Sequence, residues 1–246
     1  MPRNFFLHET VDIIGQGQYE YMDLVAREPV HDMPGLFRLA GTFFVMGASG
    51  ARWPQVINLY DGGERGWDAL TDNLDRLNLK RRERFYTDWW DEAAEFRSGG
   101  SDRLCGAAPG CPTTAELRDR GQLGTIFVHQ VLDVRVCEQL EFLSAINSVR
   151  RPLMEQRGIY LTHLLEVTNN PTEVVVVWAT DLPRWVELRK DFDTSRGLDD
   201  SGVADPQLIA WQAVERRFVT GGRTELMTPR PGSVGGPTSW DAGPLE

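Results

Sequence analysis

Apolar and polar residues alternate at the start of the chain and then change to a helical spacing. Residues 5–14 alternate and contain Phe, Val, Ile and Thr, which predicts a strand. From Gln18, apolar residues recur three or four positions apart, which predicts an amphipathic helix. The same reasoning predicts strands over residues 36–46, 54–60 and 102–107, a helix from residue 67, and a helix around residues 89–96 that Gly99–Gly100 ends.

The second half of the chain predicts the same order of elements. Strands are expected over residues 125–134, 159–168, 173–179 and 225–228. Helices are expected over residues 137–156, 182–192 and 206–217, and Gly158 is the expected stop of the first of them. Each half is therefore predicted to be a ferredoxin-like βαββαβ unit.

Residues of the two halves also match in register. On the first strand three residues recur 121 positions later, in the pairs Phe6 and Phe127, His8 and His129, and Asp12 and Asp133. Near the ends, Phe96–Gly100 corresponds to Phe218–Gly222, and Leu104 to Leu226. We predict two tandem repeats. Their expected bounds are residues 1–110 for repeat 1, 111–124 for a linker, 125–232 for repeat 2 and 233–246 for an extended C-terminal tail.

The run Val174–Val177 predicts how the two repeats pack. Apolar residues at successive positions require that both faces of this strand are buried. In a ferredoxin-like unit, helices cover one face of the sheet, so the other face has to pack against the second repeat. The predicted fold class is α+β: two tandem ferredoxin-like βαββαβ repeats that form a pseudo-dimeric α+β barrel with helices outside.

Three features resemble NIPSNAP-like proteins of the dimeric α+β barrel superfamily. The first is the tandem layout, and the second is the opening Leu7-His8-Glu9-Thr10. The third is a Gly-Gly pair that is followed by a short strand and then by Pro229-Arg230-Pro231-Gly232. The resemblance covers the chain from about Phe5 to Pro231. Members of this superfamily include cofactor-free monooxygenases, polyketide cyclases, isomerases, haem enzymes and proteins with no known reaction. The resemblance therefore implies a fold and leaves the reaction open.

Charge and composition narrow the partners. The chain has 26 basic and 36 acidic residues, and its net charge of −10 argues against nucleic-acid binding. No apolar run approaches the roughly 18–20 residues of a membrane span. The polar start and three cysteines favour a cytoplasmic protein without a disulfide framework. A homodimer of such pseudo-dimers is compatible with these features.

Few residues of this sequence are typical of catalytic sites, and most of the candidates lie in the second repeat. His8 and His129 are equivalent, whereas the counterpart of His163 is near Gly41. Strand alternation places Tyr160, Thr162, Leu164 and Glu166 on the face opposite His163. The candidate catalytic residues are His129, His163, Tyr160 and Glu166, and the candidate substrate-binding residues are His8, Trp178, Trp185 and Phe127. The alternatives are structural histidines, a solvated Glu166 and tryptophans that only fill a core.

Neither a metal nor a cofactor is expected. Zinc needs three or four converging ligands. His8 and His129 converge only if both lie near a pseudo-twofold axis. The predicted function is a cofactor-independent enzyme that uses acid/base chemistry on a small hydrophobic or aromatic molecule, of isomerase, cyclase, lyase or monooxygenase type, with a pocket between sheet and helices. The alternative is a non-catalytic small-molecule-binding or interaction protein.

Overall fold

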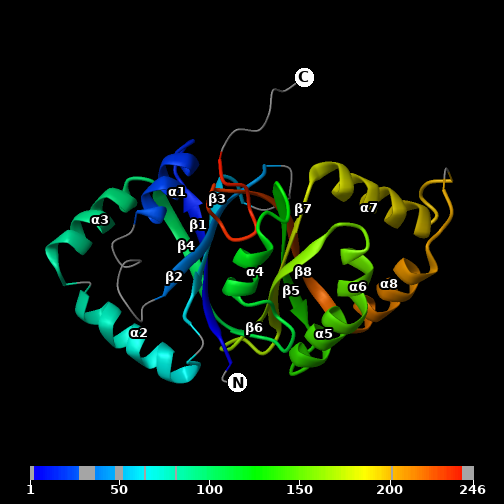
Figure 1. Cartoon of the computed structure of the whole chain (residues 1–246), viewed down its shortest axis with the longest axis horizontal. Helices are drawn as coiled ribbons and strands as arrows, with labels where there is room; N and C mark the ends of the chain where they lie inside the picture. The colour runs from blue at the N-terminus through cyan, green and yellow to red at the C-terminus, as the bar shows by residue number, and fades with distance from the viewer. Residues whose placement is uncertain are drawn as a thin grey trace.

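The strands of the chain close into one barrel, with helices outside it (Figure 1). The structure is a computed structural model and describes residues 3–27, 37–47, 52–63, 65–80, 82–200 and 202–239. The first four strands are β1 (Phe5–Ile13), β2 (Arg38–Val45), β3 (Gln55–Asp61) and β4 (Arg97–Ala107). The next four are β5 (Ile126–Val134), β6 (Tyr160–Val167), β7 (Glu173–Thr180) and β8 (Val219–Pro229).

The order of strands around the barrel is the same in both halves. The barrel runs β1-β3-β2-β8-β5-β7-β6-β4, so each half contributes its strands in the order fourth, first, third, second. Neighbouring strands are antiparallel, and the halves join where β2 pairs with β8 and β4 with β6. The predicted α+β barrel is therefore confirmed. The duplication and the bounds of the two repeats stay predictions.

The helices of each half cover the outer face of their own strands (Figure 1). The first half carries α1 (Gln18–Ala26), α2 (Trp67–Lys80) and α3 (Arg84–Ala94). The second half carries α5 (Gln139–Ala145), the π-helical turn η2 (Ile146–Arg150), α6 (Arg151–Glu155), α7 (Leu182–Ser195) and α8 (Pro206–Phe218). Among the described residues, no helix has both the length and the apolar character that crossing a bilayer requires.

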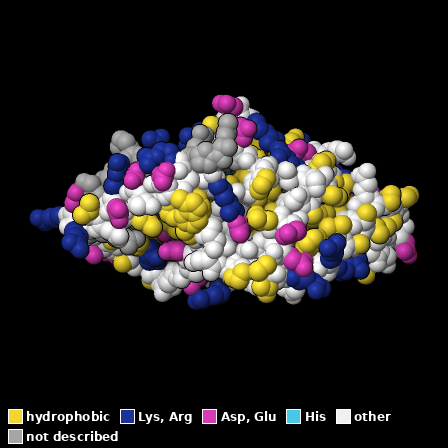
Figure 2. Space-filling model, turned by 90° about the horizontal axis from the view of Figure 1, so that it is seen from below, with side chains coloured by type: hydrophobic (Ala, Val, Ile, Leu, Met, Phe, Trp, Pro, Cys, Tyr) yellow, Lys and Arg dark blue, Asp and Glu magenta, His cyan; other side chains and the backbone are white. Residues whose placement is uncertain are grey.

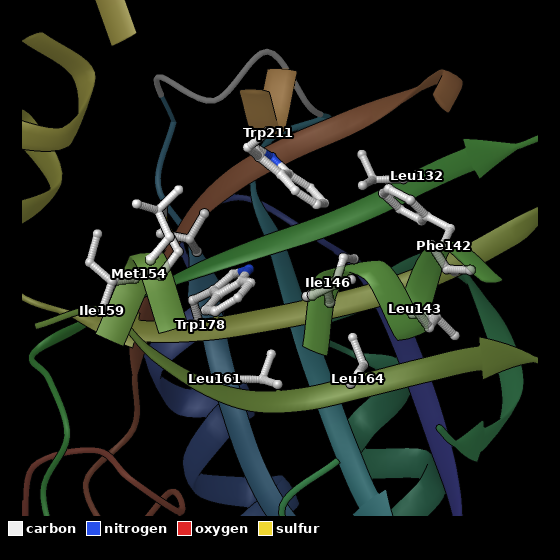
Figure 3. Packing of buried hydrophobic residues seen from close by; sticks show 14 of the residues in the cluster. Leu132, Phe142, Leu143, Ile146, Met154, Ile159, Leu161, Leu164, Trp178 and Trp211 are labelled. Carbon is white, nitrogen blue, oxygen red and sulfur yellow. The ribbon is translucent and has the colours of Figure 1, made fainter. Parts of the chain in front are cut away.

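Alternate residues of each strand belong to different cores. On β5, Phe127 and Val131 belong to the core inside the barrel, whereas Val128 and Leu132 pack under the helices of the second half. Figure 3 shows part of this outer core, which includes Trp178 of β7 and Trp211 of α8. The valines of β7 divide in the same way, two to each core. Burial on both faces, predicted from the valine run, is confirmed.

Two glycine pairs expected near element ends lie inside strands instead. Gly99–Gly100 belongs to β4 and Gly221–Gly222 to β8, so both strands start earlier than the sequence predicts. A Cβ on Gly100 would lie 2.4 Å from the Thr10 carbonyl oxygen, which shows how closely β4 approaches β1. The glycines thus permit close strand pairing, and the expectation that Gly99–Gly100 ends a helix is wrong.

The predicted helix over residues 137–156 is divided by the π-helical turn. In an α-helix, the carbonyl of Ser148 would accept a hydrogen bond from the N–H of residue 152. Residue 152 is proline, which has no N–H to donate. The backbone widens into the π-helical turn just before this proline and continues as α6.

Segments outside the two predicted repeats cover one end of the barrel. The predicted linker contains α4 (Thr114–Arg120), which Thr113 and Glu116 start with a capping box. Residues 233–236 of the predicted tail are buried, and the N–H of Val234 donates to the Ala40 carbonyl over 2.8 Å. Figure 1 shows α4 and this red segment in front of the strands. Residues 240–246 of the predicted tail lie outside the described residues.

Candidate functional site

Two histidines from opposite strands meet inside the barrel. β1 and β5 are four positions apart in the order of eight strands, so His8 and His129 approach each other across the interior. Both side chains are fully buried, their Nε2 atoms lie 2.9 Å apart, and their rings stack with centroids 5.0 Å apart. In agreement, none of the histidines that the structure describes is visible on the face drawn in Figure 2. His8 and His129 therefore converge, which the sequence predicted only on the condition that both lie near a pseudo-twofold axis.

A buried carboxylate orients this histidine pair. His129 Nδ1 lies 2.8 Å from Glu225 Oε2, and Arg223 Nε donates to Glu225 Oε1 over 2.6 Å. Burial alone would raise the pKa of Glu225, but the hydrogen bonds and charges of His129 and Arg223 outweigh it and lower this pKa. Glu225 is therefore an acceptor, and Nδ1 of His129 carries the proton.

The remaining protons of the pair follow from this assignment. Burial lowers the pKa of His129, and burial together with the unfavourable interaction between the protonated forms of the two rings lowers the pKa of His8 well below its usual value. Both rings are therefore neutral near pH 7. Nε2 of His129 accepts a hydrogen bond from Nε2 of His8, which leaves Nδ1 of His8 without a hydrogen-bond partner.

The two halves differ at the residue beside each histidine. His8 is paired in the β-ladder with Arg103 of β4, whereas His129 is paired with Glu225 of β8. Arg103 donates to both carboxylate oxygens of Glu173, at 2.6 and 3.1 Å. One histidine thus has a carboxylate partner and the other lies beside a cation. The correspondence of Leu104 to Leu226 could have revealed this difference from the sequence alone.

His163 and Tyr160 share one face of β6, although simple alternation predicts opposite faces. The register between β6 and β7 shifts between Leu161 and His163, so Thr162 forms a β-bulge. His163 lies edge-on against Phe6 inside the barrel, with ring centroids 5.3 Å apart. Tyr160 packs against the same interior core. The predicted face is wrong for Tyr160, because the bulge inserts one residue between it and His163, whereas Leu164 lies on the face opposite His163 as predicted.

The remaining predicted residues lie apart from one another. Glu166 is half-buried near the end of β6, where it forms an ion pair with Arg3. Phe127 packs inside the barrel against Phe43. Trp178 and Trp185 lie on the helix side of the sheet, where Trp178 is buried in the outer core. The predicted catalytic and binding residues therefore do not form one site.

A cavity of about 1130 Å³ lies between the strands of the second half and helices α7 and α8. Its apolar walls come from Met46, Trp185, Leu188, Phe192, Ile209 and Leu226. Its charged residues are Arg150, Arg189, Arg196, Arg216, Glu215 and Glu225. Hydrophobic side chains are also extensive on the right half of Figure 2, the side of the second-half helices. Of the predicted residues, Trp185 lines this cavity, whereas His129, His163 and Tyr160 lie on the inner face of the barrel.

Arg150 enters this cavity from the end of the π-helical turn. Its guanidinium lies between two indole rings, 5.2 Å from the centroid of Trp178 and 5.3 Å from that of Trp211. Nε and Nη1 of Arg150 have no hydrogen-bond partner, and the nearest carboxylate oxygen in an ion pair, on Glu215, is 3.6 Å from Nη1. Burial lowers the pKa of Arg150. Arg150 was not among the residues predicted from the sequence, although Pro152 inside a predicted helix was a signal of irregular backbone.

A row of polar residues crosses the first half on the helix side of the sheet. Glu9, Asn58 and Thr42 occupy paired positions on β1, β3 and β2. Asn58 donates to Glu9 over 3.1 Å, and Thr42 donates to Asn58 over 2.7 Å. Burial raises the pKa of Glu9 above its usual value. The first half therefore also contains a candidate acid/base group, which was not predicted from the sequence.

The chain shares its fold with solved structures at low sequence identity. A protein of Fusobacterium nucleatum provisionally named a monooxygenase superposes with a TM-score of 0.55 at 10% identity, over 93% of both chains. A protein of Lactobacillus acidophilus with the same provisional name gives 0.55 at 12% identity, over 95% of this chain and 97% of that one. An anthrone oxidase-like protein gives 0.53 at 12% identity, over 99% and 98%.

Sequence comparison adds no family. No family model matches the chain, and no curated protein matches it. Membership of the NIPSNAP-like family therefore stays a prediction. The chain has the fold of the dimeric α+β barrel proteins, with both sets of strands in one polypeptide.

Proposed function

We propose that this protein is an enzyme that acts on a small hydrophobic or aromatic molecule, and that the cavity beside α7 and α8 is its substrate site. The cavity is the observation that carries the proposal. Its volume of about 1130 Å³ suits a molecule of several fused rings. Trp185 and Phe192 offer flat apolar surface, and Gln130, Gln212 and Thr224 offer hydrogen bonds.

Acid/base chemistry in this cavity would use Glu215. This carboxylate lies on α8 beside Arg150 and lines the cavity. A carboxylate within reach of an acidic C–H or O–H can act as the general base. Proton removal from an aromatic substrate is the first step of isomerisation or cyclisation, and it also prepares a substrate for reaction with oxygen. The names of the structural neighbours, which include monooxygenase and anthrone oxidase-like, support the last of these.

A non-catalytic binding protein is the second candidate, and one observation favours it. The histidines, which are the usual acid/base groups at neutral pH, lie inside the barrel and not in the cavity. Among the described lining residues, the carboxylates are Glu215 and Glu225, and Glu225 is held by His129 and Arg223. A cavity with so few acid/base groups is compatible with binding alone.

The two candidates are distinguished by measuring binding and turnover together. A panel of polycyclic phenols, anthrones and aromatic acids is screened by thermal shift, and each ligand found is incubated with the protein under air. Absorbance spectra and oxygen uptake report turnover. Leu226→Trp fills the cavity and is expected to abolish binding, whereas Leu104→Trp makes the corresponding change on β4, outside this cavity.

The outcomes of this experiment separate the cases. Turnover that is lost in Glu215→Gln with binding retained supports the enzyme. Binding without turnover by any ligand of the panel favours the binding protein. Ligands that bind Leu226→Trp as well as the wild type would show that the cavity is not the site, and would overturn both candidates.

A further inference from the structure

We propose that the molecule bound in the cavity carries a carboxylate, and that Arg150 holds this carboxylate; the inference rests on the proposed function, because it takes the cavity as the ligand site. Three independent observations support it: two donors of Arg150 that make no hydrogen bond, the backbone that presents this residue, and the charge of the cavity.

The first observation is the state of the guanidinium. Arg150 is 7% exposed, yet its Nε and Nη1 atoms make no hydrogen bond. Leaving buried donors of a charged group unpaired is costly, and native proteins rarely tolerate it without a reason. The rings of Trp178 and Trp211 hold the cation in place but accept no conventional hydrogen bond. An anionic ligand atom would supply the missing acceptor.

The second observation is the backbone at this point. Arg150 is the last residue of the π-helical turn. A π-helical turn is rare, and such turns occur often at functional sites, where the inserted residue redirects the side chains. The next residue, Arg151, behaves differently: it donates to Glu155, to Asn147 and to the carbonyl of Gly110. One arginine of the adjacent pair is thus committed to structure, and the other is directed at the cavity with donors unused.

The third observation is the charge of the lining. The cavity has four arginines and two glutamates among the described residues that line it. The whole chain has the opposite balance, with a net charge of −10. A cluster of positive charge in an acidic protein attracts anions to that place. Trp185 and Phe192 extend the same wall, and Arg189 lies 5.9 Å from the centroid of each ring. The complementary ligand has a flat apolar body and a carboxylate.

The test compares an acid with its neutral isostere. Titration calorimetry measures the binding of 2-anthracenecarboxylate and of the corresponding carboxamide to the wild type, to Arg150→Gln and to Arg217→Gln. Arg217 lies on the same helix as Glu215, and its replacement removes one positive charge away from the described cavity lining. We expect the wild type to bind the acid roughly 10- to 100-fold more tightly than the amide, because a charge-assisted hydrogen bond is stronger than a neutral one by about that factor. Arg150→Gln should bring this ratio close to one, and Arg217→Gln should leave it unchanged.

Each outcome decides one statement. Equal binding of acid and amide by the wild type overturns the proposal that the ligand carries a carboxylate, while the cavity remains the ligand site. A preference that persists in Arg150→Gln overturns the role of Arg150. Failure of both probes to bind, together with no response to the wider panel, counts against the proposed function itself. If Arg150→Gln does not fold, Arg150→Lys keeps the charge with different geometry, and it should retain a reduced preference for the acid.

Discussion

His8 and His129 share one hydrogen bond between their Nε2 atoms, 2.9 Å long, although 121 positions separate them in the chain. Only His129 has a second partner, the carboxylate of Glu225. The two residues are therefore equivalent in position and different in role. His129 bonds to both Glu225 and His8, whereas His8 is the last member of this chain of hydrogen bonds.

This difference predicts unequal costs for equivalent substitutions. His129→Leu removes a hydrogen bond to the ionised carboxylate of Glu225, worth about 1.5–3 kcal/mol, and also leaves the Nε2 donor of His8 without an acceptor, at roughly 1–3 kcal/mol more. His8→Leu leaves only the Nε2 acceptor of His129 unpaired, at a cost of roughly 1–3 kcal/mol. Urea denaturation of the two variants measures the difference in the free energy of unfolding. Equal losses would show that the hydrogen bond to Glu225 adds no stability.

His163 is expected to make the folded protein sensitive to acid. Burial lowers the pKa of His163 from 6.5 to about 4. The unfolded chain therefore binds this proton at a higher pH than the folded chain does, so the free energy of unfolding falls as the pH drops from 6.5 towards 4. The loss is about 3 kcal/mol at most. His163→Leu is expected to lower stability only slightly at pH 7 and to give a shallower decline between pH 7 and 4.5.

Thermal denaturation at several pH values tests this expectation. His163→Leu also removes the bond between Nδ1 and Thr162, worth about 1 kcal/mol. The comparison therefore concerns the slope against pH and not the value at one pH. A variant whose slope equals that of the wild type would assign the acid sensitivity elsewhere, for example to the pair of His8 and His129.

Glu9 is expected to have the opposite pH dependence. Burial raises the pKa of Glu9, so the folded protein keeps this proton at a pH where the unfolded chain has lost it. The contribution of Glu9 to stability therefore declines as the pH rises through the interval between the unfolded and folded values. Glu9→Gln keeps an acceptor for Asn58 and removes the charge. We expect it to be at least as stable as the wild type at pH 7, and to lack this decline.

Melting temperatures between pH 4.5 and 7.5 provide the measurement, and Glu20→Gln is the control. Glu20 is exposed on α1, so its replacement changes the net charge by the same amount without changing a buried group. An increase in stability of equal size in both variants would mean that net charge, and not the burial of Glu9, is responsible.

Gly222 is expected to be essential for pairing β8 with β5. Its φ is +117°, and a Cβ would lie 2.4 Å from the Val131 carbonyl oxygen. Because that neighbour is backbone, it cannot move aside, and Gly222→Ala should cost about 3 kcal/mol or more. Gly121 has a φ of +70° and no atom within 4 Å of the position that a Cβ would take, so Gly121→Ala should cost about 1–2 kcal/mol from backbone strain alone. Circular dichroism and urea denaturation separate the two cases.

Local patterns along the chain were sufficient for the barrel and insufficient for the site. The valines at 174–177 predicted burial on both faces, because successive residues of a strand point to opposite faces and all four are apolar. The face of Tyr160 relative to His163 could not be predicted, because a bulge at Thr162 depends on pairing with a strand ten or more residues away. One inserted residue reverses every assignment on one side of it.

The candidate site depends even more on distant contacts. Arg150 lies between Trp178 and Trp211, which come from a strand and a helix far along the chain. Nothing near residue 150 shows that its donors are unpaired. By contrast, the register of the two predicted repeats already aligned His8 with His129, and only their meeting across the barrel required the three-dimensional structure.

The closure of both halves into one polypeptide has a consequence for how the interior can diverge. In a barrel built from two identical chains, the twofold axis copies every substitution, so a carboxylate beside one central histidine must appear beside the other as well. Here Glu225 stands beside His129 while Arg103 stands beside His8. A single polypeptide can place a carboxylate on one side of the central histidine pair and a guanidinium on the other. The barrel interior can therefore carry an asymmetric charge distribution, which twofold symmetry would not allow.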